Sequence, residues 1–161
     1  MTVDSDDIRH IPSSQGHPTR SKGIPHEGTS EEMLEAMTAF RNWLDRTQVT
    51  LTIFVIGDQL DDSIFSDWLK KLLSDHPQIT IGCHGLTHRC WSAYPEDEEG
   101  FLAALVEADI KLHQFAGDAW RPWFRAPAGY IAPWMAPIIA KAGFELDSSV
   151  NPSWLVRKKA G

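Results

Sequence analysis

The feature that most constrains the fold is a nearly unbroken run of β-branched and aromatic residues at 49–56, which ends at Gly57. Such a run predicts a strand buried on both faces, as in a parallel sheet that is covered by helices. Apolar residues at spacings of three and four flank it at 29–48 and 63–74 and predict two helices. A strand enclosed between two helices is the expected start of a β/α fold.

The same alternation of strand and helix continues along the chain. We expect the other strands at residues 1–4, 79–83, 123–125 and 144–150, and further helices at 98–115 and 133–142. Thr29 and Glu32 form a capping box that opens the first helix, after a long loop at 5–28. Strict alternation favours a parallel sheet with outer helices. The predicted fold is therefore a truncated (β/α) barrel-like sheet of about five strands, in a single domain over residues 1–161.

The composition argues against several classes of protein. A formal net charge of −7 is unsuited to a nucleic-acid surface, which needs clustered basic residues. The chain has no run of about 18 apolar residues that could span a membrane. Its acidic first ten residues do not resemble a signal peptide. We therefore expect a cytoplasmic protein in which Cys83 and Cys90 are reduced thiols.

Polar side chains follow the predicted strands, at the edge where parallel β/α folds place their active sites. Asp4, Asp6 and Asp7 follow the first strand, and His84 and His88 follow the third. Two histidines four residues apart lie on one face of a helical turn, and two histidines with one carboxylate are a usual catalytic metal set. The pattern predicts a site for one divalent cation, with Zn²⁺ as the first candidate. The alternative is a solvated acidic turn.

Three segments, in order, resemble the motifs of the polysaccharide deacetylase (NodB-homology) family of carbohydrate esterases. They are Thr-Val-Asp-Ser-Asp at 2–6, Ile-Gly-Cys-His-Gly-Leu-Thr-His at 81–88 and Phe-Arg-Ala-Pro-Ala-Gly-Tyr at 124–130. The strands at 52–57 and 144–150 also resemble strands of this family. The resemblance covers residues 1–152, and its specificity comes from several modest motifs in the right order.

The resemblance implies roles for the acidic and histidine residues. Asp4 matches the catalytic base of the family, and Asp6 matches the carboxylate ligand of its metal, with Asp7 as a rival ligand. His84 and His88 match the two histidine ligands. A member of this family is expected to hydrolyse N-acyl (acetyl) groups of an amino sugar or polysaccharide with the help of the bound metal.

The third motif carries the remaining site residues. The resemblance implies that Arg125 orients the catalytic base. It also implies that backbone N–H groups of the following loop, around Pro127, Gly129 and Tyr130, stabilise the oxyanion. The substrate expected from the resemblance is an N-acylated carbohydrate.

One part of the family pattern has no counterpart. A later Leu-x-His segment normally supplies the general acid, and residues 154–161 contain no histidine, while His113 is expected on a surface helix. We therefore expect a fragment or a shortened homologue, with an open sheet edge through which a homodimer could form. Two alternatives stay open: a related metal amidohydrolase or deformylase acting on a non-polysaccharide C–N bond, and a degenerate, non-catalytic carbohydrate-binding relative.

Overall fold

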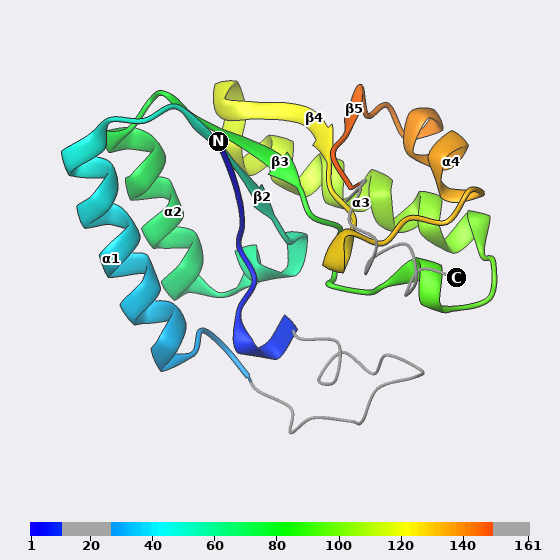
Figure 1. The fold of residues 1–161 in the computed structure, drawn as a ribbon, viewed down its shortest axis with the longest axis horizontal. Coiled ribbons are helices and arrows are strands. Elements are labelled where there is room, and N and C mark those ends of the chain that lie inside the picture. The colour runs from blue at the N-terminus through cyan, green and yellow to red at the C-terminus, as the bar shows by residue number, and fades with distance from the viewer. Residues whose placement is uncertain (11–26, 150–161) are drawn as a thin grey trace.

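The computed structural model describes residues 1–10 and 27–149, and these contain one parallel sheet (Figure 1). Its strands follow each other in chain order, and every neighbouring pair is parallel. The strands are β1 (Thr2–Asp4), β2 (Leu51–Val55), β3 (Ile79–Cys83), β4 (Trp120–Phe124) and β5 (Leu146–Asp147). The predicted barrel-like parallel sheet is thereby confirmed. Strands β1 and β5 form the edges of the described sheet, and dimerisation through an edge stays a prediction.

Four α-helices accompany the sheet in the described residues. They are α1 (Glu31–Thr47), α2 (Ser63–Asp75), α3 (Glu98–Ala116) and α4 (Met135–Lys141). Short 3-10 turns join several elements: η1 (Ile8–His10), η2 (Gly57–Asp61), η3 (Trp91–Ala93), η4 (Gly117–Ala119) and η5 (Pro127–Gly129). Helices α1 and α2 lie side by side at the β1 end of the sheet, whereas α3 and α4 lie together toward β5 (Figure 1). No helix in the described part of the chain is long and apolar enough to cross a membrane.

Strand β2 is buried on both faces, as its sequence predicts. Leu51, Ile53 and Val55 belong to the hydrophobic core between the sheet and the helices. Thr52 and Phe54 alternate with them and therefore face the opposite side of the sheet. There the hydroxyl of Thr52 lies 2.9 Å from that of Thr80 on β3.

The boundaries of some elements differ from the predicted ones. The N-cap of α1 is Ser30, whose Oγ accepts from the Met33 amide at 3.0 Å, so the predicted capping box at Thr29 is wrong. The hydroxyl of Thr29 instead donates to Asp62, at the start of α2, at 2.7 Å. The predicted loop at 5–28 contains η1, and its residues 11–26 lie outside the described part, as does the tail at 150–161.

Main-chain hydrogen bonds hold the carboxyl ends of the first three strands together. The amide of Ser5 donates to the carbonyl of Phe54 at 3.0 Å, and that of His84 donates to Val55 at 2.8 Å. The side-chain amide of Gln59 also donates to the carbonyl of Ser5 at 2.5 Å. These bonds bring the acidic segment after β1 next to the histidine segment after β3.

Candidate metal centre

Asp6, His84 and His88 come together at the carboxyl ends of β1 and β3. One carboxylate oxygen of Asp6 lies 3.3 Å from Nε2 of His84 and 3.4 Å from Nε2 of His88. The three candidate ligand atoms all lie within 4.8 Å of one another. Both histidines are buried, whereas the Asp6 side chain is 45% exposed, so one side of the cluster is open to a ligand from outside.

The spacing of these atoms fits a shared cation. Two ligand atoms that are each about 2.1 Å from a tetrahedral ion lie roughly 3.4 Å apart. The Nε2 atoms of His84 and His88 are buried and have no hydrogen-bond partner among the described residues. Buried polar nitrogens normally have a partner, so two of them facing one carboxylate are suited to hold a metal.

The main chain after β4 fixes the orientation of His84. Nδ1 of this ring lies 2.8 Å from the carbonyl oxygen of Arg125. A carbonyl only accepts, so Nδ1 carries the proton and Nε2 is left with its lone pair toward Asp6. A histidine that binds metal through one nitrogen usually donates from the other in this way.

Burial and neighbouring groups keep the candidate ligands in forms that bind a cation. Burial raises the pKa of Asp6, but the neighbouring rings of His84, His88 and His10 lower it more, so the pKa of Asp6 lies below its usual value. Burial lowers the pKa of His88 to about 4. Near neutral pH the cluster therefore contains an ionised carboxylate and a neutral His88 imidazole, the states that metal ligands need.

Asp7, the alternative to Asp6 as carboxylate ligand, makes hydrogen bonds outside the cluster. Its oxygens accept hydrogen bonds from the amide of Ile8 at 2.6 Å, from the amide of Ser30 at 3.0 Å and from the hydroxyl of Ser30. The buried carboxylate of Asp7 thereby ties the segment after β1 to the first turn of α1. The geometry therefore places Asp6 in the cluster and Asp7 in a structural contact.

Asp4 and Arg125 form an ion pair next to the cluster. Nη1 of Arg125 lies 2.7 Å from Oδ1 of Asp4. Nη2 donates to the hydroxyl of Thr2 at 2.8 Å, and Nε donates to that of Ser148 at 3.0 Å. Three donors with separate acceptors fix the guanidinium in its own plane. The expected contact between Arg125 and Asp4 is present, whereas the role of Asp4 as a base stays a prediction.

The loop after Arg125 contains η5 and lies against the histidine turn. A β-carbon on Gly85 would lie 3.5 Å from Cγ of Pro127. The amide of Gly129 donates to the carbonyl of Ala126 at 2.8 Å, and that of Tyr130 is a long 3.5 Å from the carbonyl of Pro127. Pro127 itself has no amide hydrogen to donate. The part of this loop in oxyanion stabilisation stays a prediction. Of the two amides, that of Tyr130 makes the longer hydrogen bond within the loop.

His10 is a neighbour of the cluster that the sequence patterns did not reveal. Its buried ring lies 5.9 Å from that of His88, centroid to centroid, and its Nδ1 accepts from the amide of Asp7 at 2.9 Å. Its Nε2 lies 3.8 Å from Oδ1 of Asp58. Burial, followed by the charge of Arg9, lowers the pKa of His10 to about 4. His10 is far from His84 and His88 in the chain, so no sequence spacing could have predicted that it lies beside them.

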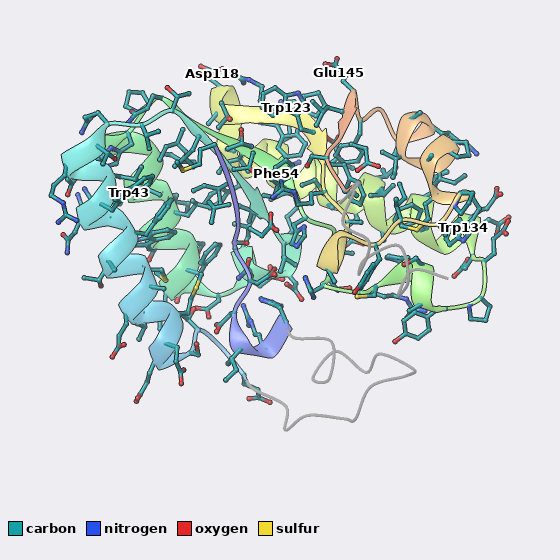
Figure 2. The ribbon with its side chains drawn as sticks, viewed as in Figure 1. Trp43, Phe54, Asp118, Trp123, Trp134 and Glu145 are labelled. Carbon is teal, nitrogen blue, oxygen red and sulfur yellow. The ribbon has the colours of Figure 1, made fainter. Side chains whose placement is uncertain are left out.

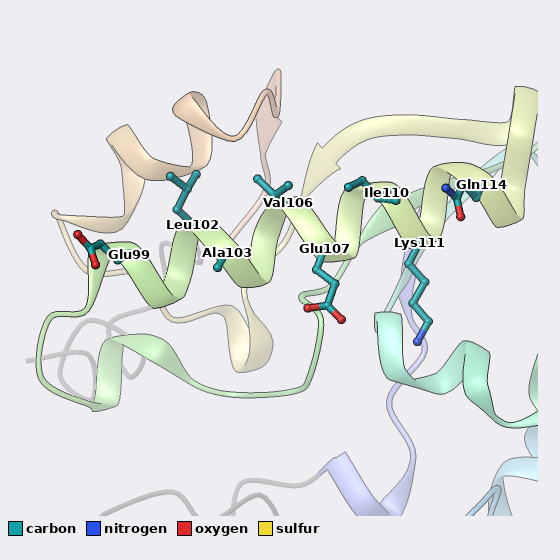
Figure 3. A pocket seen from close by; sticks show the side chains of 8 residues that line it. All are labelled: Glu99, Leu102, Ala103, Val106, Glu107, Ile110, Lys111 and Gln114. Atoms are coloured by element: carbon teal, nitrogen blue, oxygen red, sulfur yellow. The ribbon is translucent and has the colours of Figure 1, made fainter.

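Two hollows differ in their relation to these residues. A cavity of about 220 Å³ lies beside β1, lined by Asp4, Ser5 and Asp6 and by apolar residues of α1 and α2 that include Met33, Phe40 and Trp68. A groove of about 600 Å³ runs along the outer face of α3, over Leu102, Val106 and Ile110 (Figure 3). Its lining contains none of the candidate ligands, so the chemistry of this chain is expected at the β1 end instead.

The comparison with known families shows the class of protein to which this fold belongs. The profile of the family described as polysaccharide deacetylase matches residues 28–146. The chain therefore belongs to the polysaccharide deacetylase family. The matched region contains His84, His88 and Arg125, while Asp4 and Asp6 precede it. No curated protein sequence matches the chain significantly.

Solved structures with the same fold include proteins of differing activity. A Mycobacterium smegmatis protein described as a polysaccharide deacetylase is 19% identical, with a TM-score of 0.69 over 95% of this chain and 51% of its own. A carbohydrate esterase family 4 pseudoenzyme from Bacillus anthracis is 17% identical, with a TM-score of 0.58 over 70% of this chain and 38% of its own. PuuE allantoinase is 14% identical, with a TM-score of 0.56 over 89% of this chain and 50% of its own. The chain thus spans about half the length or less of these relatives.

Proposed function

We propose that this chain is a metal-dependent deacetylase that hydrolyses the N-acyl group of an amino sugar or polysaccharide. Asp6, His84 and His88 would hold one divalent cation, with Zn²⁺ as the first candidate. The observation that carries the proposal is the approach of two buried, unpartnered Nε2 atoms to one carboxylate oxygen, at 3.3 and 3.4 Å. This donor set leaves coordination positions open for water and substrate.

The residues around the cluster divide the reaction between them. Asp6, His84 and His88 would hold the cation, which would supply a Lewis acid for the acyl carbonyl and for the attacking water. Asp4 accepts the proton of the attacking water. Arg125 aims the Asp4 carboxylate and offsets its charge through the 2.7 Å contact. Amide groups of the loop around Tyr130 would stabilise the developing oxyanion. Water is consumed, and the carboxylic acid and the free amine are released.

A second candidate function uses the same residues on a different amide. The structural likeness to PuuE allantoinase extends over 89% of this chain, more than the likeness to the pseudoenzyme. An amidohydrolase acting on a small, non-sugar C–N bond would need the same cation, base and orienting arginine. The apolar cavity of about 220 Å³ beside Asp4 and Asp6 is compatible with a compact substrate as well as with an acyl group.

The deciding experiment is a hydrolysis panel on metal-stripped and zinc-reloaded protein. The substrates are N-acetylglucosamine oligomers, N-formyl amino acids and allantoin, with release of acetate, formate or allantoate as the readout. Zinc-dependent acetate release supports the deacetylase. Hydrolysis limited to the formamides or allantoin favours the second candidate. Bound zinc without any hydrolysis would indicate a non-catalytic relative and contradict both.

A further inference from the structure

We propose that Phe54 is a positioning residue that sets the plane of the Arg125 guanidinium, and that Gly82 provides the space for its ring. The inference rests on the proposed function, in which Arg125 aims Asp4 at the attacking water. Phe54 would not touch the substrate or the cation. It would act through Arg125, from the face of the sheet opposite the outer helices.

The first observation is the stacking of Arg125 on Phe54. Cζ of the guanidinium lies 4.3 Å from the centroid of the Phe54 ring, which is 1% exposed. Phe54 and Trp123 are both labelled in Figure 2; Phe54 belongs to β2, and β3 lies between this strand and β4, which carries Trp123. A guanidinium over an aromatic face is attracted to the negative face of the ring, more strongly where water is excluded.

The stack complements the hydrogen bonds of Arg125. Contacts to Asp4, Thr2 and Ser148, at 2.7–3.0 Å, lie along the edge of the planar guanidinium. They restrict its movement within its own plane. They leave both faces of the group without an acceptor, because all guanidinium donors point along the edge. The Phe54 ring covers one face, and so resists tilting of the plane away from Asp4.

The second observation concerns the place of Phe54 in the packing. The continuous hydrophobic core between sheet and helices includes its neighbours Ile53 and Val55 but not Phe54. Phe54 is nevertheless among the largest fully buried side chains of the described residues. Its burial is therefore provided by the opposite face of the sheet, where Arg125 covers it. An ordinary core phenylalanine would instead face α1 or α2.

The third observation is the space reserved for the ring by Gly82. A β-carbon at Gly82 would lie 2.7 and 2.8 Å from two carbons of the Phe54 ring and 3.0 Å from the carbonyl oxygen of Trp123. The pairing of β3 with β4 is irregular at this position, since the register shifts between Ile81 and Cys83. Such irregularities re-aim side chains near active sites. Any side chain at Gly82 would displace the ring from beneath Arg125.

The kinetic test is a double-mutant cycle between Phe54→Leu and Arg125→Ala on the zinc-loaded protein. Phe54→Leu keeps an apolar side chain but removes the aromatic face. It should lower kcat by roughly 3- to 30-fold, the usual worth of such a stack, with KM and zinc content unchanged. In the Arg125→Ala background it should cause no further loss. Phe101→Leu is the matched control, because Phe101 is a buried phenylalanine of the helix-side core. It should keep kcat within about twofold of wild type, the low end of the effect of a cation–π contact.

A spectroscopic test does not depend on activity. The Nε–H resonance of Arg125, assigned by its loss in Arg125→Ala, should be shifted upfield by the ring current of Phe54. Phe54→Leu and Gly82→Ala should each move it downfield, and Phe101→Leu should not. If a variant fails to fold, contacts between the Arg125 side-chain protons and the Phe54 ring in the wild-type nuclear Overhauser spectrum decide the question.

The two failures are distinguishable. An unshifted Arg125 resonance in folded Phe54→Leu, or absent proton contacts in the wild type, would overturn the inference whatever the activity. An equal loss of kcat in both backgrounds would also overturn it, because Phe54 would then act independently of Arg125. A chain that hydrolyses nothing but shows the shifted resonance would contradict the proposed function and leave the positioning of Arg125 by Phe54 supported.

Discussion

The carbonyl oxygen of Arg125 lies 2.8 Å from Nδ1 of His84, while the guanidinium of the same Arg125 lies 2.7 Å from Asp4. One residue at the end of β4 therefore contacts both parts of the candidate centre. Its main chain orients a proposed metal ligand, and its side chain orients the proposed base. Because only the second contact depends on the side chain, substitutions at Arg125 can separate the two.

Arg125→Ala should retain the metal and lose activity. The main-chain carbonyl that holds His84 remains, so zinc content measured by elemental analysis should equal that of the wild type. The loss of kcat should be smaller than that of Asp4→Asn, since the base is still present without its partner. A zinc content that falls with kcat would mean that the side chain supports the cluster directly.

His84→Ala should remove the cation and abolish hydrolysis, because it deletes one of the three candidate ligands of the cluster. Elemental analysis and acetate release are the measurements. The control is His113→Ala, in an exposed residue of α3, which should keep full metal content and activity. Equal zinc in His84→Ala and the wild type would contradict the assignment of His84 as a ligand.

Asp4→Asn and Asp6→Asn should differ in what they lose. Asp6→Asn should weaken metal binding, because a neutral amide is a poorer ligand for a divalent cation than a carboxylate. Asp4→Asn should keep the metal and lower kcat by about 10²–10⁴-fold, the usual worth of a positioned general base. Zinc titration and kcat are measured on both. The opposite pattern would mean that base and ligand are exchanged.

Asp7→Ala should lower stability and leave metal binding intact. It removes the acceptor of two hydrogen bonds from Ser30, one from the amide at 3.0 Å and one from the hydroxyl. Leaving buried donors unsatisfied costs about 1–3 kcal/mol of unfolding free energy, measurable by urea denaturation. A loss of zinc at unchanged stability would instead identify Asp7 as the carboxylate ligand.

The sequence was sufficient for the alternation of the fold and for the strand ends at which the cluster forms, although it left Asp7 as a rival of Asp6. Strand ends in a parallel sheet meet at one edge, so Asp6 and His84 could be brought together without coordinates. The role of Asp7 could not be inferred, because its partner Ser30 lies 23 residues away in the chain. The same is true of His10, whose neighbour His88 is brought close only by the folded sheet.

Local signals also failed where a distant residue competed for a side chain. Thr29 and Glu32 fit a capping box, but the Thr29 hydroxyl donates to Asp62, the N-cap of α2, and Ser30 is the N-cap of α1. Likewise, Phe54 alternates within an apolar run that gives no sign of Arg125 above it. Its contact depends on a guanidinium from β4 and on the missing side chain of Gly82.

The buried histidines predict a loss of stability in mild acid for the metal-free protein. Burial lowers the pKa of His10 and that of His88 to about 4, whereas an unfolded histidine titrates near 6.5. Between these values the unfolded chain binds more protons than the folded one, so the free energy of unfolding falls as the pH is lowered from about 6.5 to about 4. The loss is on the order of 3 kcal/mol for each histidine. Urea denaturation at several pH values measures it. His10→Gln should weaken this pH dependence of stability, whereas the control His113→Gln, in an exposed residue, should not. An unchanged pH dependence in His10→Gln would mean that His10 is already charged or solvated in the folded protein.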